Sequence, residues 1–322
     1  MKKYLVIVPY GLHKGIVDSQ IRDKFNFKKD VTIIEQQSES KFKFLRAFFI
    51  NKHLKGKATV YTRSIFDFLL VWFLDKLPFN DFYIQFDFRG LPSEESYLRN
   101  KSVVRRYLIQ VIESFVYRNA DEIYCVSQNM KEYLKKVFHE RPVIVEPCKI
   151  RADLLKNREV TNSRRSVLRF GYVGSMSVWQ CFERVCCLYK SIESENTVLK
   201  VFTPDKAAAE KILYDYGVVN YECNSLPREV VISSLDEVDF GFILRDNNIV
   251  NTTASPLKFA EYISRGVIPI GTRYIGDYSQ DFARLMYIVE DEEVKLDFNR
   301  LKDLLNARSY SALFDAASEL TW

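Results

Sequence analysis

The chain has 322 residues, of which 47% are hydrophobic and 28% charged, a composition typical of folded globular proteins rather than disordered or fibrous ones. At roughly 100–200 residues per domain, this length favours two domains. The 47 basic and 42 acidic side chains leave a net charge of +5, too small an excess to indicate a nucleic-acid-binding protein.

The first half alternates short apolar runs with stretches of helical period, which predicts βα units around a parallel sheet. The amino terminus lacks the unbroken apolar run and cleavage site of a signal peptide, so we interpret it as a buried strand. We expect strands at residues 4–8, 31–34, 58–61, 82–86, 122–126 and 143–145, and helices at 42–54, 64–74, 103–118 and 129–138.

Residues 151–166 are polar and without clear period, which indicates a linker. The alternation then resumes. We expect strands at residues 168–173, 198–202, 218–221, 240–244, 267–270 and 285–289, and helices at 179–193, 207–216, 227–235, 256–265 and 298–320. The predicted organisation is therefore a first domain at 1–150, the linker, a second domain at 167–304, and a terminal helix at 305–322 that could return to the first domain.

Two doubly wound, Rossmann-like α/β domains thus account for the whole chain. In open α/β sheets, ligands bind beyond the carboxyl ends of the strands. We therefore expect the active site in a cleft between two facing domains, built from the loops that follow the strands.

Several common chemistries have no motif here. The sequence contains no G-x-G-x-x-G, no Walker loop, no G-x-S-x-G and no D-x-D, which argues against dinucleotide oxidoreductases, P-loop enzymes and serine hydrolases. The three histidines lack metal-ligand spacing, so we expect neither a metal nor a cofactor. The six cysteines form no C-x-x-C pair, and we expect them to be reduced thiols in the cytoplasm.

The most informative segment is 245–270. Arg245 follows an apolar run, and Ser255-Pro256 predicts a helix start with Ser255 as the cap and Pro256 at the first helical position. Lys258 in the first turn opposes the helix dipole unless an anion lies in front of it, and Glu261 could accept hydrogen bonds from a vicinal diol. These residues describe a pocket for a nucleoside diphosphate; an ordinary capped helix with a Lys–Glu surface pair is the alternative.

Residues 255–270 resemble the donor-binding segment of the family-four retaining glycosyltransferases, which have two Rossmann-like domains in the B-type fold. The resemblance implies that Arg245 and Lys258 hold the diphosphate of a nucleotide-sugar and that Glu261 binds its ribose. It also implies transfer with retention, in which a donor phosphate oxygen takes the acceptor proton. Residues 170–179 resemble the first strand and glycine turn of the family's second domain, which implies that Gly174 and Ser175, with Ser255 and Pro256, lie near the donor.

The sequence departs from the family pattern at two places. Thr253 stands eight residues before Glu261, where the family has a second Glu that contacts the transferred sugar. The Arg and Lys often found after the glycine turn are missing, which leaves Arg245 and Lys258 to neutralise the diphosphate. Two other functions therefore remain open: a non-catalytic sugar-nucleotide-binding partner, and a sugar-nucleotide epimerase of similar fold.

The acceptor side is expected in the first domain, where residues 87–95 also fit a subgroup of the family. Asp87, Arg89, Glu94 and Glu95 cluster after a buried strand, and Asp87 is the candidate catalytic group that would orient an acceptor hydroxyl. The alternative is a structural Arg89–Glu94 pair that caps the next helix. His13, in the loop after the first strand, is a further acceptor-side candidate, although a lone loop histidine is more often structural.

Residues 41–57 carry six Lys or Arg and four Phe without an acid. Such a segment is typical of helices that bind anionic membranes, or of a helix that packs its Phe face on a sheet. We therefore expect a cytoplasmic, metal-independent hexosyltransferase, in peripheral contact with the inner face of the plasma membrane. It would extend a glycan or polyprenyl-linked acceptor in bacterial surface polysaccharide synthesis.

Overall fold

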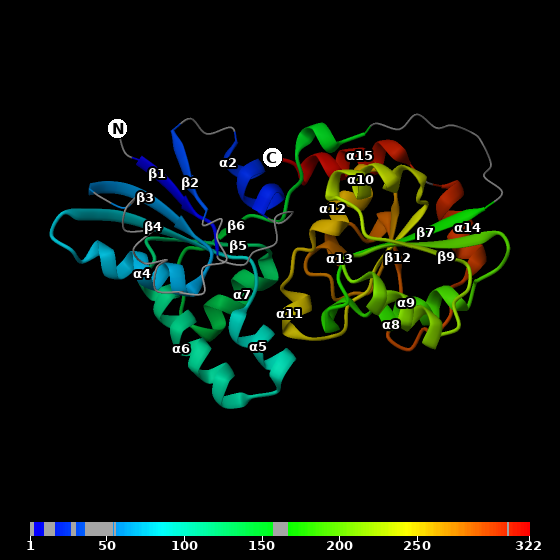
Figure 1. Cartoon of the computed structure of the whole chain (residues 1–322), viewed down its shortest axis with the longest axis horizontal. Helices are drawn as coiled ribbons and strands as arrows, with labels where there is room; N and C mark the ends of the chain where they lie inside the picture. Colours follow the sequence, from blue (N-terminus) through cyan, green and yellow to red (C-terminus); the bar gives the residue numbers. More distant parts are fainter. Residues whose placement is uncertain are drawn as a thin grey trace. The chain divides into compact units, whose positions relative to one another are not determined.

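The structure is a computed structural model that describes residues 3–9, 17–26, 30–35, 54, 56–156, 167–307 and 309–322. The chain forms two compact units, which we call unit 1 (Met1–Pro147) and unit 2 (Cys148–Trp322). Each unit is a parallel β-sheet with helices packed on its faces (Figure 1).

Unit 1 contains a six-stranded parallel sheet in the order β2-β1-β3-β4-β5-β6. Its strands are β1 (Lys3–Ile7), β2 (Val31–Ile34), β3 (Gly56–Thr62), β4 (Asn80–Phe88), β5 (Glu122–Cys125) and β6 (Ile144–Val145). Its described helices are a π-helical turn (Asp18–Arg22), α2 (Asp23–Phe25), α4 (Ile65–Asp75), α5 (Pro92–Asn100), α6 (Val103–Asn119) and α7 (Gln128–Val137). The strand order reverses between β1 and β3. In sheets of this kind, ligands bind at the loops that follow the two strands on either side of such a reversal.

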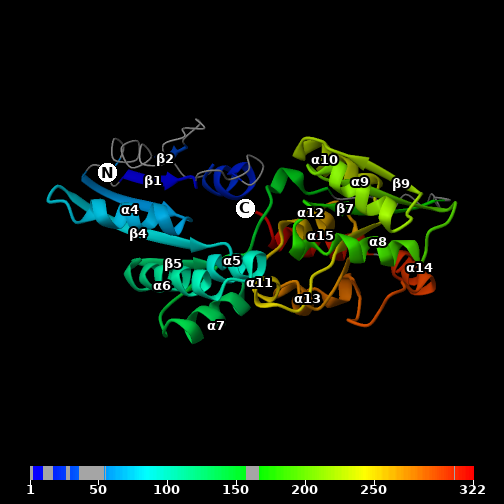
Figure 2. The ribbon, with the colours of Figure 1, turned by 60° about the horizontal axis from the view of Figure 1, so that its bottom comes forward.

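The core of unit 1 combines aliphatic and aromatic side chains from both strands and helices. Ile21 and Phe25 pack against Val6 and Tyr61 on one face of the sheet, and α4 to α7 gather on the other (Figure 2). Local sequence fixes where the larger helices begin: the hydroxyls of Ser64, Ser102 and Ser127 each accept a hydrogen bond from the backbone N–H three residues later, at α4, α6 and α7.

Unit 2 contains a second parallel sheet, in the order β12-β11-β10-β7-β8-β9. Its strands are β7 (Leu168–Val173), β8 (Thr197–Phe202), β9 (Tyr221–Asn224), β10 (Phe240–Ile243), β11 (Ile268–Gly271) and β12 (Tyr287–Ile288). Its α-helices are α8 (Phe182–Lys190), α9 (Lys206–Asp215), α10 (Arg228–Ser234), α11 (Ile249–Thr252), α12 (Leu257–Ser264), α13 (Tyr278–Asp281), α14 (Phe298–Asn306) and α15 (Tyr310–Glu319). Counted within the unit, this is the doubly wound order 3-2-1-4-5-6.

Two apolar layers sandwich the second sheet. On one face, Phe170 and Phe242 of the strands contact a cluster that includes Phe182 of α8 and Leu213 of α9. On the other face, α10, α12 and α15 build a separate cluster, and Figure 1 shows these helices on the side opposite α8 and α9. Both faces are covered, which explains why the central strands β10 and β11 are apolar and buried at every position.

The structure confirms the two doubly wound α/β halves, and most predicted elements lie within one or two residues of those observed. The predicted strand 218–221 is wrong, since β9 covers Tyr221–Asn224. Gly217, at φ +64°, and Val218 instead close α9, because their N–H groups bond back to the carbonyls of Tyr214 and Leu213.

Two predicted helices are interrupted. The helix predicted at 179–193 is a 3₁₀ turn (Val178–Gln180) followed by α8, separated by Cys181 in the left-handed conformation at φ +51°. The helix predicted at 298–320 is two helices, α14 and α15, because the side chains of Asp297 and Ser309 each cap a new N-terminus. The terminal helix α15 packs on α12 within unit 2. The helix predicted at 42–54 and the residues 157–166 of the predicted linker lie outside the described residues.

Among the residues described, no helix combines the length and apolarity needed to cross a bilayer.

Candidate active site

The candidate donor site lies at the switch point of the second sheet. β7 and β10 are neighbours there, with Phe240 paired to Phe170, and α8 and α12, which follow them, cover opposite faces of the sheet. The loops that follow the two strands therefore diverge and leave space at the carboxyl ends of the strands. Gly174 follows β7 directly, and Arg245 lies two residues beyond β10.

Gly174 allows charged side chains to approach the backbone closely. It has φ +153°, and a Cβ built there would lie 3.0 Å from Nζ of Lys258 and 3.3 Å from Oε1 of Gln180. Any larger residue would therefore push into these two side chains. The structure thus places Gly174 beside Lys258; that Gly174 lies near a bound donor stays a prediction.

Lys258 and Arg245 share one acceptor. Oε1 of Gln180 accepts hydrogen bonds from Nζ of Lys258 at 2.6 Å and from Nη1 of Arg245 at 2.9 Å. Arg245 also donates to the carbonyls of Trp179 (2.8 Å) and Leu244 (3.2 Å). The structure thus brings together two cations that the sequence separates by 13 residues, through a glutamine that the sequence analysis had not assigned to the site.

Both cations are buried and their hydrogen-bond partners are neutral. Lys258 is 8% exposed and Arg245 is 5% exposed. Burial lowers the pKa of Lys258 well below its usual value, and the adjacent Arg245 lowers it further. Burial likewise lowers the pKa of Arg245. The Lys258 ammonium also lies 4.8 Å from the centroid of the Tyr172 ring, a cation–π distance. A bound anion would stabilise both charges, because both side chains are buried and the groups that accept their hydrogen bonds are neutral.

The role predicted for Ser255 as helix cap is wrong. The N-cap of α12 is Pro256, which has extended ψ and therefore is not the first helical residue, and no side chain caps the helix. The Ser255 hydroxyl instead accepts from the backbone N–H of Cys148 at 2.9 Å and lies 2.7 Å from the hydroxyl of Tyr278. Ser255 thus fixes the loop that leads into α12, while Lys258 occupies the first turn as predicted.

Glu261 pairs with an arginine that the sequence analysis missed. Its Oε1 accepts from Nε (3.1 Å) and Nη2 (2.9 Å) of Arg228, at the start of α10. Both Lys258 and Glu261 are buried and bond to other residues, so the alternative of a Lys–Glu surface pair is wrong. At the position eight residues before Glu261, Thr253 is buried and donates to the carbonyl of Ile249 at 2.7 Å.

Ser175 helps to order the loop after β7. Its carbonyl accepts from the hydroxyl of Tyr172 at 2.7 Å, and its own hydroxyl lies 2.8 Å from that of Ser177. This holds Tyr172 in place beneath Lys258, and burial raises the pKa of that phenol, so the ring remains neutral.

In unit 1, Asp87 lies at the end of β4 and is fully buried. Its Oδ2 accepts from Nε of Arg89 at 2.6 Å and from the hydroxyl of Tyr61, and Nζ of Lys24 lies 3.8 Å away. Burial alone would raise the pKa of Asp87, but Arg89 and Lys24 outweigh it and lower the pKa to about 2. Asp87 is therefore ionised and forms ion pairs with Arg89 and Lys24.

Arg89 does not pair with Glu94, so that structural alternative is wrong. The second partner of Arg89 is Oε1 of Glu146, at 3.0 Å. Glu94 is buried and accepts from Nη2 of Arg106 and the hydroxyl of Tyr133, each at 2.7 Å.

Of the remaining acceptor-side candidates, Glu95 forms an ion pair with Arg99 one helical turn later, at 3.1 Å. His13 lies outside the described residues. Asp87 and Arg89 thus belong to one network at the carboxyl end of β4. Glu94 and Glu95, on α5, form hydrogen bonds and ion pairs with other helical residues instead.

No group of three His, Cys, Asp or Glu side chains with metal-binding geometry occurs within the described ranges. All six cysteines are in the reduced, thiol form.

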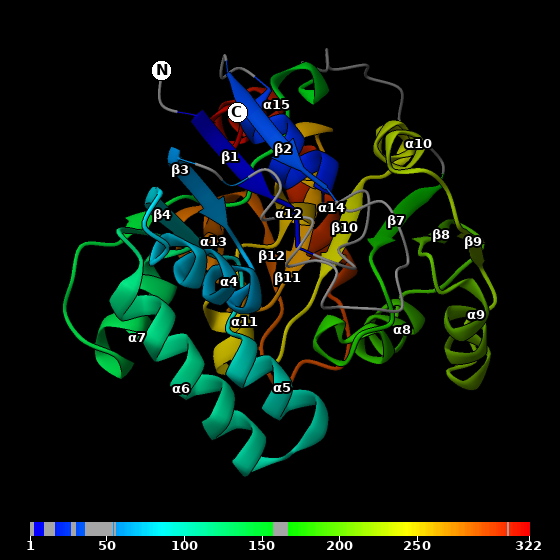
Figure 3. The ribbon, with the colours of Figure 1, turned by 60° about the vertical axis from the view of Figure 1, so that its left-hand side comes forward.

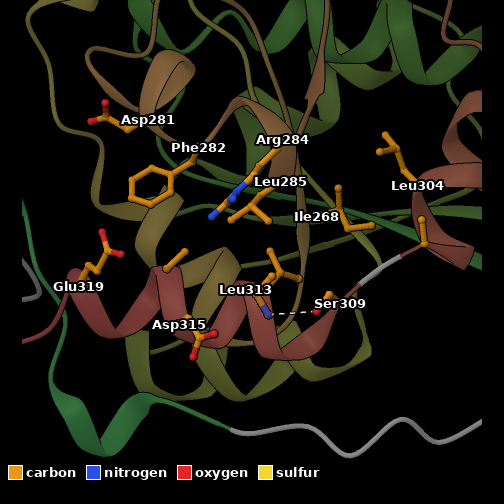
Figure 4. Close-up of a pocket in the computed structure, with 13 residues that line it drawn as sticks. Ile268, Asp281, Phe282, Arg284, Leu285, Leu304, Ser309, Leu313, Asp315 and Glu319 are labelled. Atoms are coloured by element: carbon orange, nitrogen blue, oxygen red, sulfur yellow. Dashed lines mark hydrogen bonds between the residues drawn. The ribbon is translucent and has the colours of Figure 1, made fainter.

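A cavity of about 500 Å³ lies elsewhere on unit 2, between α15 and the segment around Phe282 and Leu285 (Figure 4). Its lining includes Ile268, the first residue of β11, so it lies at the amino end of that strand. The candidate donor residues lie at the opposite edge, where doubly wound sheets bind their ligands.

Comparison with known proteins gives fold matches only. No known protein family and no curated protein matches the sequence. Among solved structures, sucrose-phosphate synthase from Thermosynechococcus elongatus matches with a TM-score of 0.70 and 13% identity over 99% of this chain and 98% of that one. WaaG, a glycosyltransferase involved in lipopolysaccharide biosynthesis, matches with a TM-score of 0.60 and 14% identity over 98% and 93%. The E. coli trehalose-6-phosphate structure bound with UDP-2-fluoro glucose matches with a TM-score of 0.62 and 10% identity over 99% and 94%.

The chain has the B-type glycosyltransferase fold. This confirms the fold that the segment 255–270 implied. The two residues that sequence analysis missed, Gln180 and Arg228, come from segments with no recognisable motif. A polar residue beside a glycine turn was the one available indication for Gln180, while the Arg228–Glu261 pair depends on packing of α10 against α12.

Proposed function

We propose that the chain is a glycosyltransferase that moves a hexosyl group from a nucleotide-sugar to a glycan or lipid-linked acceptor, with retention of configuration. The observation that carries the proposal is the buried pair of Lys258 and Arg245, which converge on Oε1 of Gln180 at the switch point of the second sheet. Two desolvated cations at the edge where such sheets bind ligands favour a ligand that carries more than one negative charge.

A diphosphate fits this arrangement chemically. Phosphate oxygens are stronger acceptors for cations than the neutral amide of Gln180, so we propose that the donor displaces that amide and takes both hydrogen bonds. Gly174 would then let the diphosphate approach the backbone where a side chain would block it. The match to a structure bound with UDP-2-fluoro glucose supports a nucleotide-sugar as the ligand.

Glu261 is proposed to bind the ribose. Arg228 occupies one side of its carboxylate and so fixes the side chain's orientation. A carboxylate held in this way can accept hydrogen bonds from both hydroxyls of a vicinal diol. Thr253 stands where the family has a carboxylate toward the sugar, so we propose that contacts to the transferred sugar come from other groups.

In the proposed reaction, the bond between the anomeric carbon and the diphosphate breaks while the acceptor oxygen bonds to the same carbon. The acceptor proton passes to an oxygen of the leaving diphosphate, so no protein base is required. Arg245 and Lys258 would stabilise the charge that develops on the diphosphate, and removal of one such group from an electrostatic site typically costs about 10²–10³-fold in rate. We propose that these side chains act without a bound metal, so chelator should leave the rate unchanged.

The acceptor is proposed to bind unit 1 near Arg89. Asp87 is fully buried and already bonded to Arg89 and Tyr61, so it acts as a positioning residue that holds the guanidinium. The likeness to WaaG, which is involved in lipopolysaccharide biosynthesis, supports a surface glycan or its lipid-linked precursor as acceptor. We further propose that the protein works in the cytoplasm, at the inner face of the plasma membrane.

The test is a panel of nucleotide-sugars incubated with the protein and a lipid extract, with release of nucleoside diphosphate as the readout. We expect release from one donor, unaffected by chelator and lost in Lys258→Met.

A second candidate, a non-catalytic sugar-nucleotide-binding protein, is favoured by Thr253 in place of a carboxylate. It predicts tight nucleotide binding without release from any donor, and that result would replace the first proposal.

A further inference from the structure

Helix α6 exposes an apolar face to solvent. Val103, Val104, Tyr107, Leu108 and Val111 are each between 51% and 71% exposed. At 100° per residue, these five side chains fall within an arc of about 140° on one side of the helix. Isolated apolar side chains are normal on a protein surface, but a continuous stripe along a helix marks a surface that contacts something else.

This stripe is separate from the face by which α6 packs in unit 1. Val116 and Tyr117, on the opposite side of the helix, are fully buried. The exposed stripe ends after Val111, because Phe115, one turn further along the same side, packs its ring edge-on against that of Trp72 in α4, with centroids 4.9 Å apart. The helix is therefore apolar on two sides, of which unit 1 covers one. A helix apolar on both sides is characteristic of an element with a second apolar neighbour.

The charges around the stripe are basic. Lys101, just before α6, and Arg105 and Arg118 within it are exposed. The single acidic residue of α6, which the structure describes throughout, is Glu113, and it is buried. Apolar side chains flanked by exposed basic ones, without exposed acid, complement a surface that is both apolar and negatively charged.

The stripe also lies on a projecting part of unit 1. α5 and α6 form a helical hairpin, in which Lys101 turns the chain in the left-handed conformation at φ +54° and Ser102 caps α6. Figure 3 shows the two helices extending together away from the first sheet. The hairpin tip carries Val103 and Val104 beside Lys101 and Arg105, so the apolar and the basic side chains are presented together.

We propose that the stripe of α6 and the tip of the α5–α6 hairpin bind unit 1 to the surface of an anionic lipid bilayer. Tyr107, Leu108 and Val111 would lie at the level of the headgroups and upper acyl chains, and Lys101 and Arg105 would contact lipid phosphates. This surface does not involve the donor site and stands independently of glycosyl transfer. It is also distinct from residues 41–57, which lie outside the described residues.

The test is flotation of the full-length protein with vesicles of phosphatidylcholine alone or with 30% phosphatidylglycerol (about one charged lipid in three), at low and high salt. We expect flotation with the anionic vesicles at low salt, and at least about tenfold weaker binding in the double variant Val104→Glu, Leu108→Glu. Lys101→Glu with Arg105→Glu should weaken binding by at least about 30-fold, at roughly fivefold per charge removed.

The matched control is Val219→Glu in unit 2, because Val219 is 72% exposed and Val104 is 71% exposed. This control should float like the wild type. All variants should keep the wild-type thermal shift with nucleotide, which shows that they fold and separates this proposal from the donor site.

Three results would overturn the proposal. The first is a wild-type protein that stays with the unbound fraction, and the second is a double variant that floats as well as the wild type. The third is a dimer in sedimentation that the double variant dissociates while lipid binding is unchanged, which would assign the stripe to a second copy of the chain.

Discussion

Lys258 provides the sharpest test of the donor site, because its charge should harm the free protein and help the complex. In the free protein the ammonium is buried beside Arg245, and both burial and that neighbour lower its pKa. Lys258→Met keeps the length of the side chain and removes the charge. Gln180 would still accept from Arg245, so no new buried group loses its partner. We therefore expect the free variant to be at least as stable as the wild type.

The complex should behave in the opposite way. A nucleotide at 100 times its dissociation constant stabilises a protein by about 2.7 kcal/mol. In a unit the size of Cys148–Trp322, where roughly 1 kcal/mol moves the midpoint by about 2–4 °C, this predicts a rise of about 5–11 °C in the wild type. The variant should show little or no rise at the same concentration.

The assay is a thermal melt of both proteins with UDP, GDP, dTDP, ADP and CMP. Lys211→Met, at an exposed lysine of α9, is the control and should keep the full shift. An equal shift in Lys258→Met and the wild type would refute the assignment of the diphosphate to this lysine. A free variant that melts well below the wild type would contradict the expectation that the buried charge destabilises the free protein.

Three further predictions concern pH and packing. Nucleotide affinity should fall as the pH rises through the pKa of Lys258, which lies well below 10.5, because the ammonium then loses its charge. Calorimetry should find no such fall in Lys258→Met. Burial raises the pKa of Glu113 from 4.5 to about 7, so its proton is held more tightly in the folded state and stability is lost as pH rises between these values. Glu113→Gln should therefore gain stability over the wild type between pH 5 and 8, by at most about 3 kcal/mol in urea unfolding, and a constant difference would contradict this. Gly174→Ala should keep the circular dichroism spectrum of the wild type but lose nucleotide stabilisation, and a normal shift would mean that the diphosphate binds elsewhere.

Much of the fold could be predicted because the strands of both sheets are short apolar runs between helices of clear period. The errors occur where the backbone conformation or the capping hydrogen bond of a single residue interrupts a helix. Cys181 takes a left-handed conformation and Ser309 caps a new helix, and each interrupts what the sequence pattern presents as one continuous helix. Hydrophobic periodicity averages over many residues and does not register such local choices.

The candidate donor site was predictable where its residues lie close together in sequence. Arg245, Lys258 and Glu261 lie within 17 consecutive positions of one recognisable segment. Gln180 and Arg228 come from other segments and reach the site only through packing. The glycine turn before Gln180 was its one indication, and nothing in the sequence around Arg228 predicted its role. The role of Ser255 was misassigned because a Ser-Pro pair is typical of a helix start, while here the hydroxyl bonds to Cys148 and Tyr278 instead.

The central claim is that the cations of unit 2 bind the diphosphate of a nucleotide-sugar. A crystal structure of the protein with the nucleotide selected by the thermal melts tests it most directly. The account predicts phosphate oxygens within hydrogen-bond distance of Nζ of Lys258 and Nη1 of Arg245, with the amide of Gln180 displaced and the ribose on Glu261. A nucleotide bound elsewhere, with both cations still bonded to Gln180, would contradict it.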